Sequence, residues 1–507
     1  MTDGSPFPNG SADGIPPPAL PPTNDPLLRT LFARFPAVAE WRREAQGTVL
    51  EVVRQDLRPP GPPGISPVLR GHIRAAAERH FGPDIATKAD KRLRDTPHVL
   101  MAQHHGINCH PEFIQATLMF ALPELLGQAG DDSVAPVLAC SSVALRSYSY
   151  PRGLLLARRP DAGGNIRLPL FPASQGDTLV SAAPPLCREQ LLRALLQWKT
   201  LGLTAKELRA AMDLAEEHLL VPDVLDLTSF SDQITRINAS TWRALCGPKA
   251  PALLFLDMEH IATALLAESL RNGDSLFSRL LLDSGPRREL CARLAGVPGC
   301  WPEPGRAETA GTGTAFFWLS RNGRRRRFVL RESPEPCLVA QDTLIPLTRD
   351  ALLEGLETKR LIPGLYCSCM LLSYVHGLLP HGGMYMMEYL PRMRRATHAV
   401  ARQLGLAATV QAAFPQAALG TALMPLRVRQ QPAWACGLVE LLPFRHHLPD
   451  ALRQIAKMAA SKVSLFAFAD WWLESTAQAN RSDDWPEALA QLLAHAEGFS
   501  VPQRPHI

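Results

Sequence analysis

Four side chains able to bind a metal ion or move a proton are crowded into residues 104–110: His104, His105, Cys109 and His110. Imidazole and thiolate are good ligands for zinc and iron, but this spacing follows no established metal-binding pattern. An imidazole, with its pKa near 6.5, also suits a general base. Three interpretations stay open: a metal site of His104, His105 and His110, an anion site formed with the amides of a helix N-terminus, or a structural turn.

A candidate nucleophile follows in the sequence Cys140-Ser141-Ser142, directly after an apolar run. A Cys at the end of a strand acts as a nucleophile when a base lies nearby, and His104 or His105 would be that base. His104, His105 and Cys140 are then the expected catalytic residues. The sequence lacks the Gly-x-Ser-x-Gly pattern of a nucleophile elbow, so a small residue packed under a loop is the alternative.

Substrate-binding candidates lie on both sides of the expected cleft. Arg146 and Arg152 follow Cys140, and a guanidinium binds a carboxylate or a phosphate through two hydrogen bonds. Gly382 and Gly383 precede a helix, and paired glycines let a ligand approach the backbone closely. The full expected set is Gly106, Asn108, Ser141, Arg146, Arg152, Gly382, Gly383, Glu388 and Tyr389.

The segment before Gly382 contains further potential metal ligands, namely Cys367, Cys369, His376 and His381. Its remaining residues are mostly apolar, and a buried cysteine packs as a small hydrophobic residue. We therefore expect these cysteines to be structural.

Three apolar runs, residues 98–102, 134–139 and 251–257, predict the strands that position these groups. The first and third lead into helical stretches; Cys140 directly follows the second run, and His104 follows the first after Gln103. This alternation predicts an α/β fold with a Rossmann-like parallel sheet and substantial helical additions. Ligands bind such sheets at the carboxyl ends of the strands, so we expect the polar clusters after the first two runs to meet there.

Other periodic segments predict the surrounding elements. Helices are expected at residues 26–58, 66–80, 112–126 and 258–271, with two more in 186–220. Asn322-Gly323 predicts a hairpin of residues 316–319 and 327–330, and the run Arg324 to Arg327 is expected to be a solvated strand end. We expect a disordered proline-rich tail over 1–26, an α/β core over 27–343 with a helical insertion at about 186–250, and a mainly helical region over 344–507 that completes the cleft.

Composition excludes several classes of protein. A net charge of +5 over 507 residues does not favour a nucleic-acid protein with a broad basic face. The ten cysteines form no regular framework, the N-terminus lacks the features of a signal peptide, and no apolar stretch reaches the ~20 residues of a membrane span. We expect a cytoplasmic protein that acts on a small molecule without nucleic acid or membrane, and we leave a homo-oligomer open.

The order of these features resembles the enzyme family that adds cysteine to glucosaminyl malate in bacillithiol biosynthesis. The similarity covers most of residues 66–440. It is carried by a turn, two strands, a hairpin, a helix start, a Gly-Gly segment and a Pro-x-x-x-Arg strand at residues 102–106, 136–139, 253–270, 318–330, 348–352, 361–389 and 425–429. The resemblance implies a nucleotidyl-transferase-like core and ligase-like C–N bond formation involving an amino acid.

This chain also departs from the family. Where the family has a Glu-Asp-His-Asp motif after its second strand, this chain has Cys140-Ser141-Ser142-Val143, so we expect acidic chemistry to be absent from that strand end. His104 and His105 replace a pair of Gln, and no long coiled coil is evident near the C-terminus.

These observations favour a small-molecule biosynthetic enzyme of a specialised metabolite pathway, ligase-like in its reaction. One alternative is an iron- or zinc-dependent enzyme that uses His104, His105 and His110. Another is a non-catalytic binding protein that has kept the fold. No Walker-type motif is present, so a nucleotide cofactor would have to bind in another way.

Overall fold

A computed structural model describes residues 25–58, 64–101, 103–127, 133–157, 165–297, 301, 313–406, 427–428, 436–465, 468 and 500–501. The expected disordered tail lies outside these residues except for its last two positions, where the first helix begins. No helix in this described part of the chain is long and apolar enough to cross a membrane.

Four parallel strands form the central sheet, in the order β12-β1-β2-β5. Smaller sheets are β10-β9-β8, β11-β6-β7, β3-β4 and β13-β14. The strands are β1 (His98–Leu100), β2 (Val134–Ala139), β3 (Gly153–Leu156), β4 (Ile166–Pro169), β5 (Ala252–Asp257), β6 (Phe317–Arg321), β7 (Arg324–Arg327), β8 (Val329–Arg331), β9 (Cys337–Ala340), β10 (Thr343–Pro346), β11 (Leu361–Pro363), β12 (Leu379–His381), β13 (Arg427–Val428) and β14 (Ser500–Val501).

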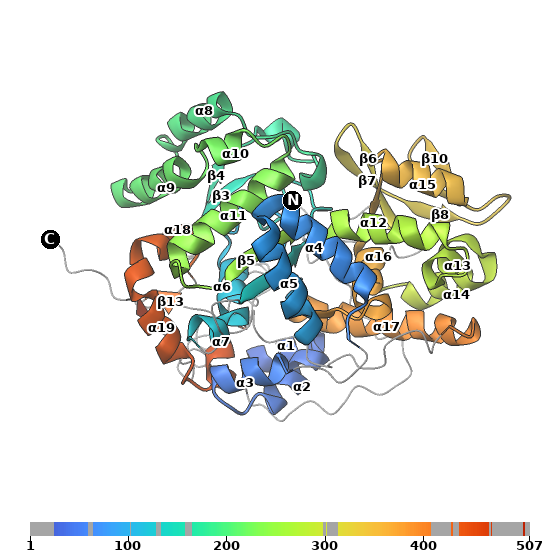
Figure 1. Cartoon of the computed structure of the whole chain (residues 1–507), viewed down its shortest axis with the longest axis horizontal. Helices are drawn as coiled ribbons and strands as arrows, with labels where there is room; N and C mark the ends of the chain where they lie inside the picture. Colours follow the sequence, from blue (N-terminus) through green and yellow to red (C-terminus); the bar gives the residue numbers. More distant parts are fainter. Residues whose placement is uncertain are drawn as a thin grey trace.

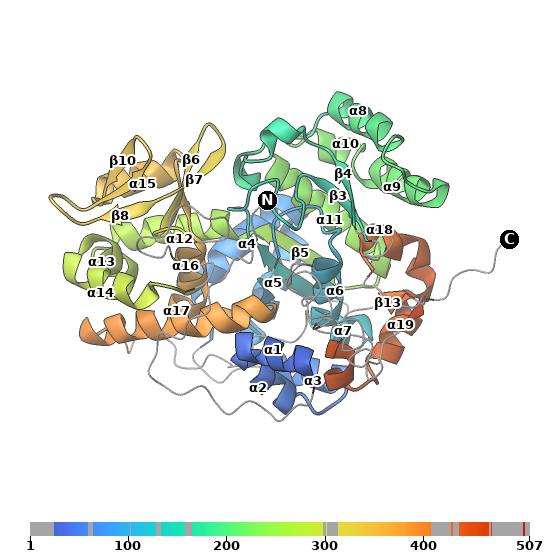
Figure 2. The same cartoon turned by 180° about the vertical axis from the view of Figure 1, so that it is seen from behind.

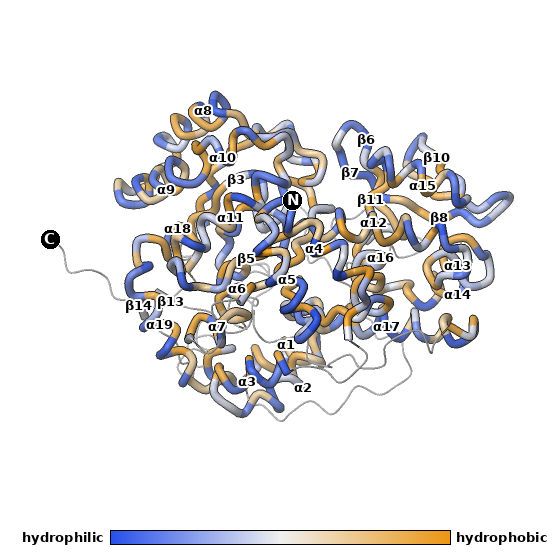
Figure 3. Tube along the Cα trace, viewed as in Figure 1, coloured by the Kyte–Doolittle hydropathy of each residue, from blue (hydrophilic) through white to orange (hydrophobic). Residues whose placement is uncertain are grey.

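Helices surround this sheet on both sides (Figures 1 and 2). They are α1 (Pro26–Arg34), α2 (Pro36–Glu44), α3 (Val49–Asp56), α4 (Pro67–Phe81), α5 (Pro83–Asp95), α6 (Pro111–Phe120), α7 (Leu122–Leu125), α8 (Arg188–Trp198), α9 (Ala205–His218), α10 (Pro222–Leu225), α11 (Phe230–Cys246), α12 (Met258–Arg271), α13 (Leu276–Leu282), α14 (Ser284–Leu294), α15 (Arg349–Glu357), α16 (Leu365–Cys369), α17 (Met384–Gln403), α18 (Leu438–Leu441) and α19 (Leu448–Ile455). Hydrophobic and hydrophilic residues alternate along the peripheral helices (Figure 3).

Strand β2 shows why the sheet is covered on both faces. All six of its residues are buried. Ala135, Val137 and Ala139 join one hydrophobic cluster, which includes residues of α6 and α11. Val134 and Leu138 join the other, which includes residues of α4, α5 and α12. A parallel strand buried on both faces is apolar throughout, as its sequence predicts.

The three predicted strands are confirmed as β1, β2 and β5, but the fourth strand was missed. β12 has only three residues, Leu379-Pro380-His381, and it lies at the edge of the sheet beside β1. Proline cannot donate a ladder hydrogen bond, so it is tolerated mainly in edge strands and usually argues against a strand. Pro380, within a segment expected to be mainly helical, is why β12 was missed.

A buried pair of histidines links the edge strand β12 to its neighbour β1. Nδ1 of His98 lies 2.6 Å from Nε2 of His381, and Nε2 of His98 lies 2.9 Å from the carbonyl oxygen of Arg58. Burial lowers the pKa of His98 to about 4, so the ring is neutral near pH 7. Because a carbonyl only accepts, His98 donates from Nε2 and accepts at Nδ1 from His381.

Helix boundaries differ from the predictions mainly at prolines. The helical stretch expected over 26–58 is three helices, and the second begins at Pro36. The helix expected over 112–126 is broken between α6 and α7, where Pro123 follows. Proline is favoured in the first turn of a helix, so a new helix begins at or just before each of these prolines. The two helices expected in 186–220 are confirmed as α8 and α9.

The hairpin turn at Asn322-Gly323 is confirmed, but its second strand, expected over 327–330, is β7 at Arg324–Arg327, so the prediction for the arginine run is wrong. Arg324 to Arg327 are strand β7 itself, and only Arg324 is exposed.

Candidate functional site

The carboxyl ends of β1, β2 and β5 meet at one edge of the central sheet. His104 forms a parallel bridge with Cys140, and the amide of His105 donates to the carbonyl of Cys140 over 2.8 Å. Asp257 ends β5 in register with Ala139, the last residue of β2. The structure therefore brings together the two polar clusters, as the strand pattern predicted.

A buried carboxylate, Glu259, lies beneath Cys140. Its Oε1 accepts from Sγ of Cys140 at 3.1 Å and from Oγ of Ser142 at 2.8 Å. Its Oε2 accepts from the amide of Ser141 at 2.6 Å and lies 3.1 Å from Oγ of Ser141. Glu259 lies in the first turn of α12 and is 2 % exposed, so three consecutive residues after β2 are held by one carboxyl group.

Burial, and then the charge of the neighbouring Asp257, raise the pKa of Glu259 to about 7, although the hydrogen bonds from Cys140, Ser141 and Ser142 act in the opposite direction. Both protonation states of Glu259 are then populated near neutral pH. This is the property that a general acid or base requires.

Cys140 is a thiol rather than a thiolate at neutral pH. Burial and the charge of Glu259 raise the pKa of Cys140 well above its usual value. The side chain is nevertheless partly exposed. The thiol donates to Glu259, and the negative charge of that carboxylate disfavours a thiolate beside it, so Cys140 is placed to relay a proton rather than to attack as a nucleophile.

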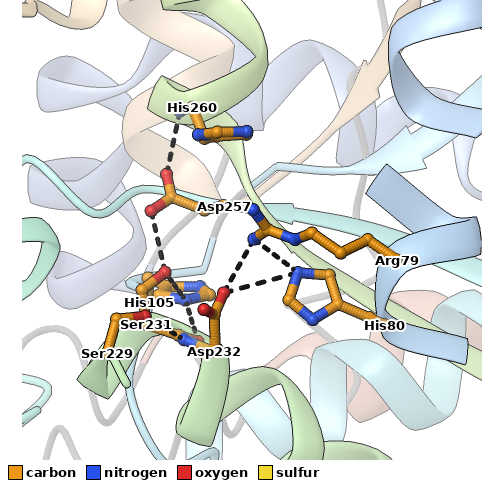
Figure 4. A network of polar contacts seen from close by, with 8 residues as sticks. All are labelled: Arg79, His80, His105, Ser229, Ser231, Asp232, Asp257 and His260. Carbon is orange, nitrogen blue, oxygen red and sulfur yellow. Dashed lines mark hydrogen bonds and ion pairs between the residues drawn. The ribbon is translucent and has the colours of Figure 1, made fainter. Parts of the chain in front are cut away.

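Asp257 organises a second network beside the first (Figure 4). Oγ of Ser231 donates to Oδ2 of Asp257 at 3.0 Å and lies 2.9 Å from Nε2 of His105. Oγ of Ser141 donates to Oδ1 of Asp257 at 2.6 Å, which joins the two networks. With Ser231 donating to Asp257, Nε2 of His105 is the donor to Ser231.

His105 is fully buried and stacks on Phe255 with ring centroids 5.5 Å apart. Burial lowers its pKa, so the ring is neutral. Its Nδ1 atom is buried without a hydrogen-bond partner among the described residues. His105 therefore carries a lone pair directed into the protein interior.

The network extends to the end of α4. Asp232, in the first turn of α11, pairs with Arg79 at 2.7 Å and lies 3.6 Å from His80 (Figure 4). Burial and then Arg79 lower the pKa of His80 to about 4. Arg79 and His260 also line a small recess between α4 and α12.

His104 belongs to an aromatic cluster instead. Its Nδ1 lies 2.7 Å from Oγ of Ser149, and its ring packs edge-on against Phe113 and Tyr148. Burial, with smaller effects of His110 and Arg325, lowers the pKa of His104 to about 3. A group with so low a pKa is a weak base at neutral pH, so Glu259 matches the role of base better than His104.

The predicted metal ligands do not converge. His105 lies in the Asp257 network, whereas His104 and His110 pack on Phe113 and Tyr148. Throughout the described ranges, no group of three or more His, Cys, Asp or Glu side chains could hold a metal ion.

The thiols of the downstream segment are structural, as expected. Cys367 and Cys369 are fully buried in a hydrophobic cluster, and burial raises their pKa values. His376 lies 2.7 Å from Oγ of Ser66, at the N-terminus of α4.

Gly106 and Asn108 fix the turn after β1. The amide of Asn108 donates to Oδ1 of Asn238 at 2.9 Å, and Nδ2 of Asn238 donates to the carbonyl of Gly106 at 2.9 Å. One side chain of α11 thus holds the turn, which positions His104 and His105.

The two predicted arginine clamps have different surroundings. Arg152 donates from Nε to the carbonyl of Phe171 at 2.7 Å and so holds the β3 region. Arg146 forms an ion pair with Asp177 at 2.8 Å, and its side chain is 71 % exposed. Of the two, Arg146 has the greater freedom to meet a ligand.

The predicted residues of the opposite wall serve the packing of α17. A Cβ added at Gly382 would lie 2.4 Å from Sδ of Met386, and Gly383 caps the helix. Glu388 accepts from the amide of Ala37 at 3.1 Å, which ties α17 to α2, and Tyr389 packs against the hydrophobic cluster around α4 and α12. The described contacts of Glu388 and Tyr389 do not include Cys140.

Sequence reasoning missed Glu259, Ser231 and Arg325. The expectation that acidic chemistry is absent from this strand end is wrong, because Asp257 and Glu259 supply it from the next strand. The signal was the sequence Asp257-Met258-Glu259-His260 at the end of the third predicted strand.

Comparison with protein-family models, curated proteins and solved structures gives no match to this chain.

Proposed function

We propose that the chain is a small-molecule biosynthetic enzyme whose proton transfers are carried out by Glu259 at the carboxyl edge of the central sheet. The observation that carries the proposal is the 3.1 Å contact between Cys140 and Glu259, with the pKa of Glu259 raised to about 7. A buried carboxyl group that titrates near neutral pH beside a partly exposed thiol marks a candidate functional site, because perturbed pKa values cluster at such sites.

The reaction class that we propose is ligase-like C–N bond formation involving an amino acid, in keeping with the family resemblance. An attacking amine must lose a proton as its nitrogen bonds to carbon, while the leaving group departs with its electron pair. Glu259 would accept that proton, directly or through the Cys140 thiol or the Ser142 hydroxyl that bond to it. Asp257 and Ser231 would hold His105 and Ser141 in place.

The strand order supports a nucleotidyl-transferase-like, Rossmann-like core. Numbered by their order along the chain, the strands β5-β2-β1-β12 follow 3-2-1-4, the first four positions of the doubly wound dinucleotide-binding sheet. The order reverses between β1 and β12, and ligands bind at such a reversal outside the carboxyl ends. Gly382 and the turn after β1 border this point, one strand away from Cys140.

The proposed setting is the cytoplasm, with a small-molecule substrate and neither nucleic acid nor membrane as partner. All nine described cysteines are free, which fits a reducing compartment. A nucleotide cofactor would occupy the reversal between β1 and β12.

The experiment begins with native mass spectrometry of the untagged protein as purified, since a retained nucleotide or amino-acid conjugate names half of the reaction. Turnover of that compound is then compared in wild type and in Glu259→Gln, His104→Gln and His105→Gln. A general base contributes a factor of about 10²–10⁴, so Glu259→Gln is expected to lose at least a hundredfold in kcat. Its pH profile is also expected to lose the limb near pH 7.

Glu268→Gln is the matched control, because Glu268 is an exposed glutamate on the same helix, bonded to His72. Full turnover in Glu259→Gln would overturn the proposed base. A ligand bound and released unchanged by wild type would favour the non-catalytic binding protein.

A further inference from the structure

The strand β7 presents one guanidinium to the site. Nη1 of Arg325 donates to the carbonyl of Ser142 at 3.2 Å, and Ser142 follows Cys140 and Ser141 in the chain. Its Cζ atom lies 4.1 Å from the centre of the Trp318 ring on β6. The ring and the carbonyl hold the guanidinium in one orientation next to Cys140, and they bring no negative charge to it.

Positive charge exceeds negative charge around this guanidinium. Burial lowers the pKa of Arg325 most, Cys140 acts in the opposite direction, and Arg327 and Arg146 lower it further. Asp177 is the carboxylate that acts in the opposite direction, and it already pairs with Arg146 at 2.8 Å. Among the described residues, no carboxylate lies within ion-pair distance of Arg325.

A largely buried cation without a counter-ion is costly unless a ligand supplies the charge. The guanidinium carries five N–H donors, and Ser142 is its one described hydrogen-bond acceptor. The planar fork of donors fits the two oxygens of a carboxylate or a phosphate.

We propose that Arg325, stacked on Trp318 beside Cys140, binds a carboxylate or phosphate group of the substrate, with Arg146 at the exposed side of the same subsite. This inference rests on the proposed function, because it names the substrate class of that site as anionic. Arg325 thereby takes the place of Arg152 as the second arginine of the anion site, because Arg152 donates to the carbonyl of Phe171.

The test uses inorganic phosphate and malonate as probes, titrated separately into the full chain by calorimetry. Wild type is expected to bind at least one of them, and the stronger probe shows whether the subsite prefers phosphate or carboxylate. A charge-assisted hydrogen bond contributes about 1.5–3 kcal/mol, so Arg325→Gln is expected to weaken binding about tenfold or more. Arg325→Lys keeps the charge but loses the fork, and an intermediate affinity is expected.

Arg326→Gln is the matched control. Arg326 lies on the same strand with the same charge, and its side chain points to the other face of β7. Binding by Arg326→Gln is expected to stay within about twofold of wild type. Equal losses in both Gln variants, or no binding of either probe by wild type up to about 50 mM, would overturn the proposal.

Circular dichroism shows whether Arg325→Gln folds. If it does not, Arg325→Lys is used in its place, and a second readout is added. It compares the alkylation of Cys140 by iodoacetate and by iodoacetamide, located by mass spectrometry. The anionic reagent is expected to be favoured in wild type and less so in Arg325→Lys; an unchanged ratio would count against the subsite. Glu259→Gln is expected to bind the probes normally, so a failure of the proposed base is distinguishable from a failure of the anion subsite.

Discussion

Sγ of Cys140 and Oε1 of Glu259 lie 3.1 Å apart although 119 positions separate the two residues in the chain. Cys140 follows β2 and Glu259 opens α12 after β5, so the parallel pairing of these strands produces the contact. The pairing of Ala139 with Asp257 brings the two residues together. The residue after Ala139 is Cys140, and the helical turn after Asp257 carries Glu259.

The reactivity of Cys140 should increase when Glu259 is neutralised. The negative charge of Glu259 raises the pKa of Cys140, so Glu259→Gln is expected to raise the thiolate fraction and speed alkylation by iodoacetamide several-fold near pH 8. Peptide mapping by mass spectrometry follows Cys140 separately from the other cysteines. Glu268→Gln should leave the rate unchanged, and a slower reaction in Glu259→Gln would contradict the assigned interaction.

Glu440 should make the fold more stable in mild acid. It accepts from the amides of Gly437 at 2.8 Å and Ala157 at 2.9 Å, and burial raises its pKa to about 7 from 4.5. Since the folded state holds this proton more tightly than the unfolded state, the contribution is full below pH 4.5 and is lost as pH rises through about 7.

Urea unfolding of wild type and Glu440→Gln at several pH values isolates this group, because other titrating residues affect both proteins alike. The free energy of unfolding of wild type relative to the variant is expected to fall by up to about 3 kcal/mol between these pH values. A difference that stays constant with pH would show that Glu440 titrates normally.

His98 should have the opposite dependence on pH. Burial lowers its pKa to about 4 from 6.5, so its contribution to stability is present above pH 6.5 and is lost as pH falls through about 4. His98→Gln removes this titration, and wild type is expected to lose up to about 3 kcal/mol relative to the variant on acidification. Nitrogen NMR of labelled histidine checks the tautomer directly: Nε2 of His98 should carry the proton and Nδ1 should not.

Arg287 should be one of the most sensitive positions for stability. It is fully buried, donates to Glu332 at 2.9 and 2.7 Å, and donates to the carbonyl of Leu281 at 2.8 Å. Arg287→Ala leaves these acceptors without a partner and is expected to lower the free energy of unfolding by about 3 kcal/mol. Arg288→Ala, its neighbour on the exposed side of α14, is expected to change it by less than about 0.5 kcal/mol. If Arg287→Ala and Arg288→Ala lowered the free energy of unfolding equally, the buried ion pair of Arg287 would not contribute to stability.

The sheet was predictable where the chain signals it locally. β2 and β5 are uninterrupted apolar runs, and the polar residues after them stand out by type. β12 was not predictable in the same way, because three residues containing Pro380 resemble a break more than a strand. Its place beside β1 depends on packing between segments that are 281 residues apart in the chain.

The candidate site was predictable only in part, for a related reason. His104, His105 and Cys140 were found because they follow predicted strands, and the turn that holds them was recognised by Gly106 and Asn108. Glu259 was missed because a glutamate in the first turn of a helix is common and is usually solvated. Its role depends on burial by α12 and the β2 turn, which no local pattern encodes.

The position of β12 also bears on how the protein is made. The central sheet lacks its edge strand until residue 381 has left the ribosome. Until then β1 exposes an unpaired backbone edge with His98 lacking its partner, and such an edge can pair with other chains. A nascent chain paused before residue 381 should therefore depend on chaperones more strongly than one paused after it.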